Sequence, residues 1–448
     1  MAKSLEFTKA FKKYAHKEAI VYRSNVYTYQ DLLDKIETWD RYFSKYPDQA
    51  IFAVESDFSV DSIAIVFSLI KKNAIIVPLD IKNHKLNQKK YDIAEINFLL
   101  SIENGNYEIT EFPKNSRDNE YYSRIFELNV PGLVLFTSGS SGNPKGAVHN
   151  FSSLLKKFEA NRPTYVTINF LLFDHWGGLN TMFHILSNGG KLVLLEERQP
   201  DYICSLIQKY EVELLPTSPT FLNMLLASRA YKRYDLSSLK LITYGSEPMP
   251  ENVLKLLNTT FAGVKFHQTY GLIELGVMQS KSESNGSLWV KIGGEGYKVR
   301  VNDNMLEIKS NSEMLGYLNA PSPFTDDGWF KTGDLVEVKG EYFKILGRQS
   351  ELINVGGEKV FPQEVENVIL QMDNVLDVLV YGEKNLMAGN IVCAKVQLKN
   401  IEDHFVFKKE LKQFCRKRLE RFKIPARIKI VDHNIVSGRF KKQRFKSP

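Results

Sequence analysis

The chain has 448 residues, of which 43% are hydrophobic and 25% charged, proportions ordinary for a soluble globular protein with two or three domains. Its formal net charge is +7. The longest apolar stretch, near Ile63 to Ile70, is far shorter than the roughly 18 residues of a membrane span, which excludes a chain built around such spans.

The N-terminal residues, Met1 to Lys17, contain no apolar segment of the kind that a secretory signal needs. The three cysteines, Cys204, Cys393 and Cys415, are widely separated and lack the spacing of metal ligands. We therefore expect reduced thiols in a cytoplasmic protein rather than a disulfide framework.

Short apolar strands alternate with helical stretches along most of the chain, which predicts layered α/β domains. The expected strands are Ala50 to Val54, Ala74 to Val77, Phe98 to Ser101, Leu133 to Phe136, Lys191 to Leu195 and Leu239 to Tyr244. The expected helices are Ser59 to Lys71, Ser152 to Glu159, Tyr202 to Tyr210 and Thr220 to Ala230. Thr217 or Ser218 is suited to cap the last of these helices.

The strand from Leu133 to Phe136 runs directly into a segment of small and hydroxyl-bearing residues. Its members are Thr137, Ser138, Gly139, Ser140, Ser141, Gly142 and, at the end, Lys145. Small residues let backbone N–H groups turn inward, and hydroxyls with an ammonium complete a lining for phosphate oxygens. The segment is not a Walker A loop, because Gly146 rather than Ser or Thr follows Lys145. A mobile linker is the alternative, but the preceding strand favours a phosphate-binding loop.

The composition changes in the last third of the chain. Short strands with turns over residues 288–342 predict a small antiparallel barrel. After Arg348 we expect a compact α+β unit, with strands near Val375 to Tyr381 and Ile391 to Leu398 and a basic helix from Lys408 to Lys423. The predicted organisation is a large N-terminal domain over residues 1–347, which includes the β-rich subdomain 288–342, and a small C-terminal domain over residues 348–448.

Positive charge gathers at the C-terminus, where residues 407–448 carry 15 Lys or Arg against three acidic residues. The segment lacks interleaved aromatic residues and any nucleic-acid-binding motif, so we expect no nucleic acid partner. It either binds an anionic partner or forms a solvated surface.

The phosphate-loop segment, together with other motifs in order, resembles the adenylate-forming (AMP-binding) superfamily of acyl-CoA synthetases, luciferases and peptide-synthetase adenylation domains. The motifs are Tyr27-Thr28-Tyr29-Gln30-Asp31-Leu32, Val77-Pro78-Leu79-Asp80, Phe173-Asp174-His175-Trp176-Gly177-Gly178, Tyr244-Gly245-Ser246-Glu247-Pro248-Met249, Gln268-Thr269-Tyr270-Gly271-Leu272-Ile273-Glu274, Gly328-Trp329-Phe330-Lys331-Thr332-Gly333-Asp334-Leu335, Leu346-Gly347-Arg348 and Gly356-Gly357-Glu358-Lys359-Val360-Phe361-Pro362. The resemblance implies a large N-terminal domain of layered α/β subdomains plus a small β-barrel. A small mobile α+β C-terminal domain would follow a hinge near residues 347–350.

The resemblance also implies a role for each motif residue in ATP binding. The segment that ends at Lys145 would hold the β- and γ-phosphates, and Glu274 would hold Mg²⁺, a hard cation that prefers carboxylate oxygen. The ring of Tyr270, with Gly271 beside it, would lie on one face of the adenine. The other implied contacts are Ser246, Glu247 and Pro248 on the second adenine face and Asp334 and Arg348 on the ribose.

The carboxylic acid substrate is implied to bind beside the nucleotide. The pocket residues would be His175, Trp176, Tyr244, Leu272 and Leu275, and core packing explains His175 and Trp176 equally well. Gly356 and Gly357 would line a tunnel for a thiol, because only glycine allows a close backbone approach. We count His175 with Lys145, Glu274 and Arg439 as candidate catalytic residues.

Three positions depart from the family pattern. Ile273 stands where a Thr usually precedes the Mg²⁺-associated Glu274, and Ser350 stands at a hinge position where Asp is common. Arg439 takes the place of the catalytic Lys, unless Lys441 does that work. Arg for Lys at a close contact is not conservative.

The resulting hypothesis is an ATP- and Mg²⁺-dependent ligase that converts a small carboxylic acid to an acyl-AMP and transfers the acyl group to CoA. One alternative is a stand-alone adenylation enzyme that loads an amino or other acid onto the phosphopantetheine of an acidic acyl or peptidyl carrier protein. A second is a degenerate, non-catalytic nucleotide-binding member. A luciferase-like oxidase is a more distant one.

Overall fold

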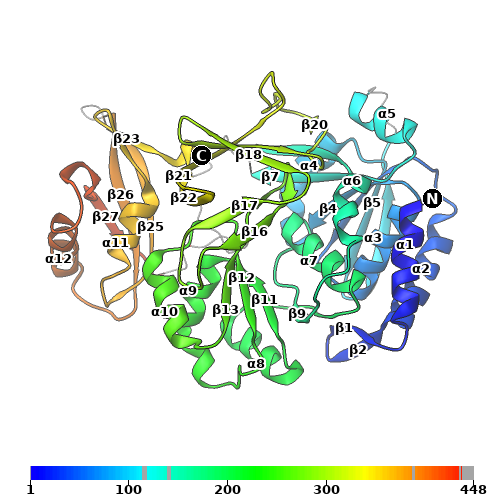
Figure 1. Ribbon diagram of the computed structural model, residues 1–448, viewed down its shortest axis with the longest axis horizontal. Helices are drawn as coiled ribbons and strands as arrows, with labels where there is room; N and C mark the ends of the chain where they lie inside the picture. Colours follow the sequence, from blue (N-terminus) through cyan, green and yellow to red (C-terminus); the bar gives the residue numbers. More distant parts are fainter. Residues whose placement is uncertain (1, 114–118, 139–142, 386–388, 433–434, 436–448) are drawn as a thin grey trace.

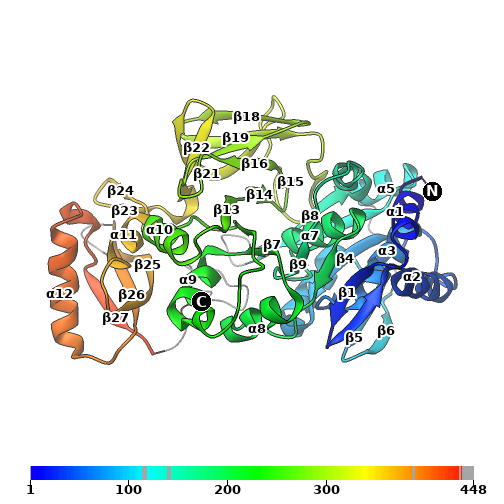
Figure 2. The same ribbon diagram turned by 60° about the horizontal axis from the view of Figure 1, so that its bottom comes forward.

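The protein is described by a computed structural model that covers residues 2–113, 119–138, 143–385, 389–432 and 435, with residues 2–6 and 138 given by their backbone alone (Figure 1). Three main sheets and a C-terminal α+β unit make up the fold (Figures 1 and 2). The α/β class expected from the sequence is confirmed.

The first sheet has seven strands. In spatial order they are β20 (Gly316–Tyr317), β8 (Pro144–Asn150), β7 (Gly132–Ser138), β4 (Ile75–Asp80), β3 (Ile51–Ser56), β5 (Phe98–Glu103) and β6 (Asn106–Glu111). The strands from β7 to β5 are parallel, and every residue of β3 and β4 is buried. Burial on both faces explains why the sequence of these strands is apolar without alternation.

Helices cover both faces of the first sheet. Phe52 and Val54 share one core with α1 (Ala2–Lys13), α2 (Tyr29–Phe43) and α3 (Val60–Lys71). Ile51 and Ala53 share another core with α4 (His84–Ala94) and α5 (Glu120–Glu127). Alternate residues of one strand therefore serve opposite layers, as strand geometry requires.

The second sheet also has seven strands. They are β13 (Lys265–Gln268), β12 (Leu241–Tyr244), β11 (Leu214–Thr217), β9 (Val166–Ile168), β10 (Lys191–Val193), β1 (Glu18–Tyr22) and β2 (Asn25–Thr28), all parallel except β2. The associated helices are α6 (Phe151–Leu155), α7 (Trp176–Ser187), α8 (Pro200–Tyr210), α9 (Pro219–Ser228) and α10 (Glu251–Thr260). Ser218 caps α9, where its hydroxyl accepts a hydrogen bond from the N–H of Phe221, so the capping prediction is confirmed.

The third sheet is antiparallel and lies above the other two in Figure 2. Its strands are β16 (Gln279–Ser282), β17 (Val290–Gly293), β22 (Tyr342–Arg348), β21 (Phe330–Lys339), β19 (Met305–Ser310) and β18 (Tyr297–Asn302). This is the β-rich subdomain, and it begins earlier and ends later than residues 288–342. A two-stranded hairpin, β14 (Gly271–Leu272) and β15 (Gly276–Val277), connects it to the second sheet.

The C-terminal unit has its own core, whose buried members all come from Ile353 onward. Its strands are β23 (Ile353–Val355), β24 (Glu358–Val360), β25 (Val375–Asn385), β26 (Gly389–Leu398) and β27 (Arg427–Ile430), with helices α11 (Pro362–Ile369) and α12 (His404–Arg416). The expectation of a basic helix from Lys408 to Lys423 was wrong at its end, since α12 stops at Arg416. Lys423 instead pairs with Glu364 and Glu420, which ties this segment to the start of α11.

Several short 3-10 turns complete the chain: η1 (Ile81–Asn83), η2 (Lys156–Phe158), η3 (Ala230–Lys232), η4 (Gln349–Glu351) and η5 (Arg421–Lys423). The three cysteines are free and buried. Within the described ranges, every helix is too short or too polar to traverse a lipid bilayer.

Candidate active site

The phosphate-loop segment connects two antiparallel strands, β7 and β8. Thr137 pairs with Lys145, and Ser138 pairs with Pro144, so the two ends of the segment are fixed side by side. Four expected phosphate contacts, Gly139, Ser140, Ser141 and Gly142, lie outside the described residues.

Two residues of a neighbouring segment hold Lys145 in place. The Lys145 Nζ lies 5.4 Å from the centroid of the Tyr317 ring, within the range of a cation–π interaction. The Asn319 side chain accepts a hydrogen bond from the N–H of Gly146 (3.1 Å) and donates one to the carbonyl of Pro144 (2.9 Å). Asn319 thus bonds to the backbone on both sides of Lys145.

Tyr317 also contacts the candidate metal ligand. Its hydroxyl donates a 2.6 Å hydrogen bond to Oε1 of Glu274. Burial, and next the charge of Glu274, raise the pKa of Tyr317, so the phenol remains a donor. The cationic end of the phosphate-loop segment and the Glu274 carboxylate therefore meet at one tyrosine.

Glu274 fits a Mg²⁺ ion that arrives with nucleotide. Among the residues that the structure describes, His, Cys, Asp and Glu form no group of three or more that could hold a metal. Mg²⁺ in nucleotide sites is commonly held by one or two carboxylates plus phosphates and water, which is a donor set that Glu274 can join. We expect Glu274 to hold the ion, which would neutralise phosphate charge when bound.

The turn expected at the adenine follows β12, at the carboxyl end of the second sheet. The Thr269 N–H donates a 2.8 Å hydrogen bond to the carbonyl of Tyr244, so this turn lies against the segment that leads to Tyr270. A Cβ on Gly245 would lie 2.5 Å from Thr269 Oγ1 and 2.7 Å from the Thr269 carbonyl oxygen, so only glycine fits there.

The residues after Gly245 lie at or near the surface. Ser246 has a φ of 69°, in the left-handed region that non-glycine residues rarely adopt. Its side chain is exposed, and Glu247 and Pro248 are half-buried. Backbone strain of this kind is found mainly where a ligand contact or a tight turn requires it.

A carboxylate on the third sheet meets Tyr270. The Tyr270 hydroxyl donates a 2.6 Å hydrogen bond to Oδ2 of Asp334, and Arg348 Nε lies 3.3 Å from Oδ1. Asp334 and Arg348 are direct register partners in β21 and β22. Burial raises the pKa of Asp334, although Arg348 and Tyr270 both act to lower it, and burial raises the pKa of Tyr270 well above its ordinary value.

The expected acid-pocket residues occupy separate cores. His175 caps α7, where its Nδ1 accepts a hydrogen bond from the N–H of Gly177 (3.0 Å), which leaves Nε2 to carry the proton of the neutral ring. Trp176 belongs to the core between the first two sheets, Tyr244 to the core of the second, and Leu272 and Leu275 to the core under the third. All four are at least nine-tenths buried.

The remaining expectations fall at the C-terminal side. Gly356 and Gly357 form the exposed turn between β23 and β24, with φ values of 61° and 96°, so backbone conformation requires glycine there. Ser350 is exposed in η4, and Ile273 is half-buried. Arg439 and Lys441 lie outside the described residues.

Sequence reasoning missed Tyr317 and Asn319. The sequence contains the run Gly316-Tyr317-Leu318-Asn319. These residues reach the phosphate-loop segment only because β20 pairs with β8 in antiparallel orientation. Nothing in the local sequence predicts that pairing across more than 160 residues.

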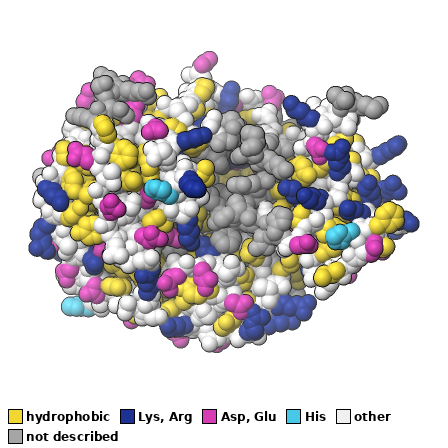
Figure 3. All heavy atoms as spheres, turned by 180° about the vertical axis from the view of Figure 1, so that it is seen from behind, with side chains coloured by type: hydrophobic (Ala, Val, Ile, Leu, Met, Phe, Trp, Pro, Cys, Tyr) yellow, Lys and Arg dark blue, Asp and Glu magenta, His cyan; other side chains and the backbone are white. Residues whose placement is uncertain are grey.

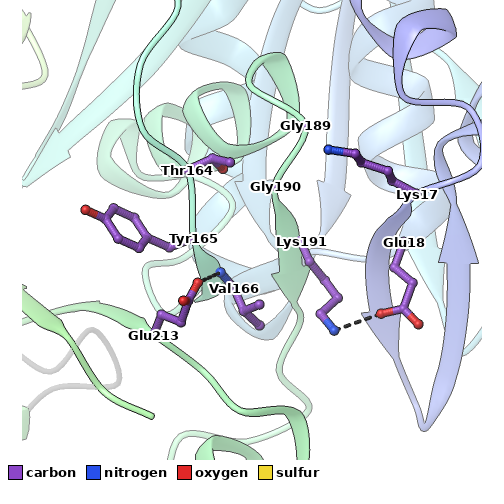
Figure 4. Close-up of a pocket in the computed structure, with 9 residues that line it drawn as sticks. All are labelled: Lys17, Glu18, Thr164, Tyr165, Val166, Gly189, Gly190, Lys191 and Glu213. Atoms are coloured by element: carbon purple, nitrogen blue, oxygen red, sulfur yellow. Dashed lines mark hydrogen bonds and ion pairs between the residues drawn. The ribbon is translucent and has the colours of Figure 1, made fainter.

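A surface hollow of about 330 Å³ lies elsewhere (Figure 4). Its walls are Lys17, Glu18, Thr164, Tyr165, Val166, Gly189, Gly190, Lys191 and Glu213. Val166 and Lys191 begin strands of the second sheet, whereas Tyr244 ends one. The hollow is therefore at the opposite edge of this sheet from the residues around Tyr244 and Tyr270.

Matches to known proteins cover most of the chain. Residues 54–303 match the AMP-binding enzyme family, and residues 364–437 match the AMP-binding enzyme C-terminal domain. Indoleacetate–CoA ligase of Aromatoleum aromaticum is 29% identical over 331 residues, which are 68% of this chain and 64% of the ligase. Acyl-CoA synthetase 7 of Caenorhabditis elegans is 30% identical over 337 residues, 68% of this chain and 62% of the synthetase. The match thus spans less than two thirds of either relative.

The fold is also that of a solved structure. ATP-bound MatB from Rhodopseudomonas palustris superposes with a TM-score of 0.80 at 22% sequence identity, over 97% of this chain and 96% of that one. The likeness extends through the C-terminal unit.

Proposed function

Because the chain belongs to the AMP-binding enzyme family, we propose that it activates a carboxylic acid with ATP and transfers the acyl group to the thiol of CoA. The observation that carries this proposal is the Tyr317 contact, which brings the Lys145 ammonium and the Glu274 carboxylate to one place. A Mg²⁺-triphosphate needs both groups, a cation beside its phosphates and a carboxylate beside its metal ion. The similarity to indoleacetate–CoA ligase supports the choice of reaction.

The nucleotide would bind between the phosphate-loop segment and Tyr270. Lys145 would neutralise the β- and γ-phosphates, and Tyr270 and the turn at Ser246 would flank the adenine. Asp334 would accept hydrogen bonds from the ribose hydroxyls. Burial raises the pKa of Asp334, and hydrogen bonds from two hydroxyls would stabilise its ionised carboxylate.

In the first step a carboxylate oxygen of the acid attacks the α-phosphorus. A bond forms between these two atoms, and the bond from the α-phosphorus to the oxygen that bridges to the β-phosphorus breaks. Pyrophosphate leaves with that oxygen and its electron pair. The chain would contribute positioning and charge neutralisation, which are the main sources of catalysis in transfers at phosphorus.

In the second step the sulfur of a thiol attacks the acyl carbon, and the bond from that carbon to the phosphate oxygen of AMP breaks. AMP leaves with that oxygen and its electron pair, and the thiol proton passes to solvent. We propose that the unit after Gly347 rotates about residues 347–350 and brings the Gly356–Gly357 turn to the thiol. This turn is exposed, and no atom lies within 4 Å of a Cβ added at either glycine, so it is free to meet another surface.

A carrier-protein thiol is the second candidate acceptor. Figure 3 shows Lys and Arg side chains gathered at the edge of the molecule where the C-terminal unit lies, and an acidic carrier protein would complement that charge. A non-catalytic nucleotide-binding protein is the third candidate, which Ile273 and Arg439 favour.

One experiment separates the three. A panel of aryl, fatty, dicarboxylic and amino acids is incubated with ATP and Mg²⁺, alone, with CoA or with a phosphopantetheinylated carrier protein. Pyrophosphate, AMP and thioester are scored separately. Acid-dependent pyrophosphate with thioester on CoA supports the proposal, and thioester on the carrier alone supports the second candidate. ATP binding without acid-dependent AMP would contradict both.

A further inference from the structure

Lys157 contacts the hairpin that follows Tyr270 through a backbone carbonyl and not through a carboxylate. Its Nζ donates a 2.9 Å hydrogen bond to the carbonyl of Val277, and Val277 is the register partner of Gly271 in the β14–β15 hairpin. Among the described residues, no carboxylate forms an ion pair with this ammonium, and the centroid of the Phe158 ring lies 5.2 Å from it. Burial of an ammonium without a counter-ion costs free energy, which an anion beside it would offset.

A polar donor that has no partner among the described residues lies at the adjoining residue of the same strand. A Cβ on Gly276 would lie 3.3 Å from Nε1 of Trp176 and 3.2 Å from Leu154, which is one turn before Lys157. The Trp176 side chain is 2% exposed, and its indole N–H has no acceptor among the residues described. Two donors thus lie against successive residues of β15.

Two further polar side chains lie on the face of α7 that carries Trp176. Trp176, Asn180 and His184 are spaced by four residues and so lie on one side of the helix. The Asn180 Oδ1 is buried with no donor in the described part of the chain. Burial, and next the charges of Arg162 and Lys157, lower the pKa of His184, so it is neutral at ordinary pH. Positive charge here comes from Lys157 and Arg162.

We propose that Lys157 is a specificity-determining residue and that the acid activated by this chain carries a second carboxylate, remote from the reacting one, which the Lys157 ammonium binds. The inference rests on the proposed function, since it assigns the far end of the acid to the groups where α7 and Lys157 meet the β14–β15 hairpin. The Trp176 N–H would donate to the same carboxylate. An anion there would offset the burial that lowers the pKa of Lys157 to about 7.

The test uses matched pairs of acids that differ only at the far end, such as hexanoate with hexanedioate and benzoate with benzene-1,4-dicarboxylate. The proteins are the wild type, Lys157→Met, Lys157→Arg and the control Lys156→Met, an exposed neighbour. Two readouts are taken: kcat and KM for pyrophosphate release, and equilibrium binding of each acid in the presence of a non-hydrolysable ATP analogue.

The wild type should prefer the diacid of at least one pair. Lys157→Met should raise KM for that diacid about 10- to 100-fold with little change in kcat, because a charge-assisted hydrogen bond is lost. The monoacid should be unaffected, Lys157→Arg should retain part of the preference, and Lys156→Met should behave as wild type.

Two results would overturn the inference while leaving the proposed function intact: a wild type that prefers the monoacid of every pair, or a Lys157→Met protein that loses both acids equally. If the wild type turned over no acid, the proposed function would fail. The equilibrium binding of the acids would still decide whether Lys157 binds the second carboxylate. Tighter diacid binding lost in Lys157→Met supports the inference, and equal binding overturns it.

Discussion

Tyr270 and Asp334 share a 2.6 Å hydrogen bond although 64 positions separate them in the sequence. Tyr270 follows the last strand of the second sheet, Asp334 lies in the third sheet, and Arg348 contacts the other oxygen of the same carboxylate. Three residues that we propose to bind the nucleotide therefore meet at the buried carboxylate of Asp334.

Asp334→Asn should separate stability from nucleotide binding. Burial raises the pKa of Asp334 in the folded chain. Its ionised form therefore lowers the free energy of unfolding at pH values above the pKa that Asp334 has in the unfolded chain. Asn keeps an acceptor for Tyr270 without that charge. We expect the melting temperature at neutral pH to be unchanged or higher, while ATP affinity falls about tenfold or more. Calorimetry of unfolding and of ATP binding measures both. A variant that binds ATP as wild type would contradict the ribose assignment.

Tyr317→Phe should slow adenylation with little effect on stability. The variant keeps the ring beside Lys145 but loses the hydroxyl that orients Glu274. A hydrogen bond to a charged group contributes about 1.5–3 kcal/mol, so kcat/KM for pyrophosphate release should fall about tenfold or more. Tyr107→Phe, at an exposed tyrosine of β6, is the control. Equal rates for both variants would mean that Tyr317 does not position Glu274.

Gly245→Ala should separate the adenine turn from the Tyr270 segment. The new Cβ would lie 2.5 Å from Thr269 Oγ1 and 2.7 Å from the Thr269 carbonyl oxygen, so the backbone must shift. We expect a loss of about 1–3 kcal/mol in unfolding free energy and weaker ATP binding. Gly286→Ala is a matched control, because its nearest atom would be 3.9 Å away. Normal stability and ATP affinity in Gly245→Ala would show that the turn is not tightly packed.

Diacid binding should weaken as pH rises above about 7. Burial, helped by the charge of Arg162, lowers the pKa of Lys157 to about 7, so the empty site loses its ammonium above that pH. His184 is neutral over this range because its pKa is also lowered. KM for the diacid should therefore rise with pH, and KM for the matched monoacid should not. Lys157→Arg should flatten the profile because the guanidinium stays protonated. Parallel profiles for both acids would contradict the assignment.

The local sequence predicted those elements that depend mainly on interactions between neighbouring residues. The strand at Leu133 to Phe136 and the Ser218 cap follow from apolar runs and turn chemistry that neighbouring residues decide. The fold class followed from the ordered motifs.

Contacts between distant segments were not predictable in this way. Tyr317 matters because β20 pairs with β8, and Lys157 matters because its side chain reaches the Val277 carbonyl 120 positions away. The end of α12 at Arg416 depends in the same way on the pairing of Lys423 with Glu364. Tertiary packing decides such features, so periodicity alone does not contain them.

A crystal structure of the chain with ATP and Mg²⁺ would show where the nucleotide binds. We expect the triphosphate within hydrogen-bond distance of Lys145, the metal at Glu274, the adenine between Tyr270 and the turn at Ser246, and the ribose hydroxyls on Asp334. Nucleotide bound anywhere else, including the hollow at Lys17 and Lys191, would contradict this expectation.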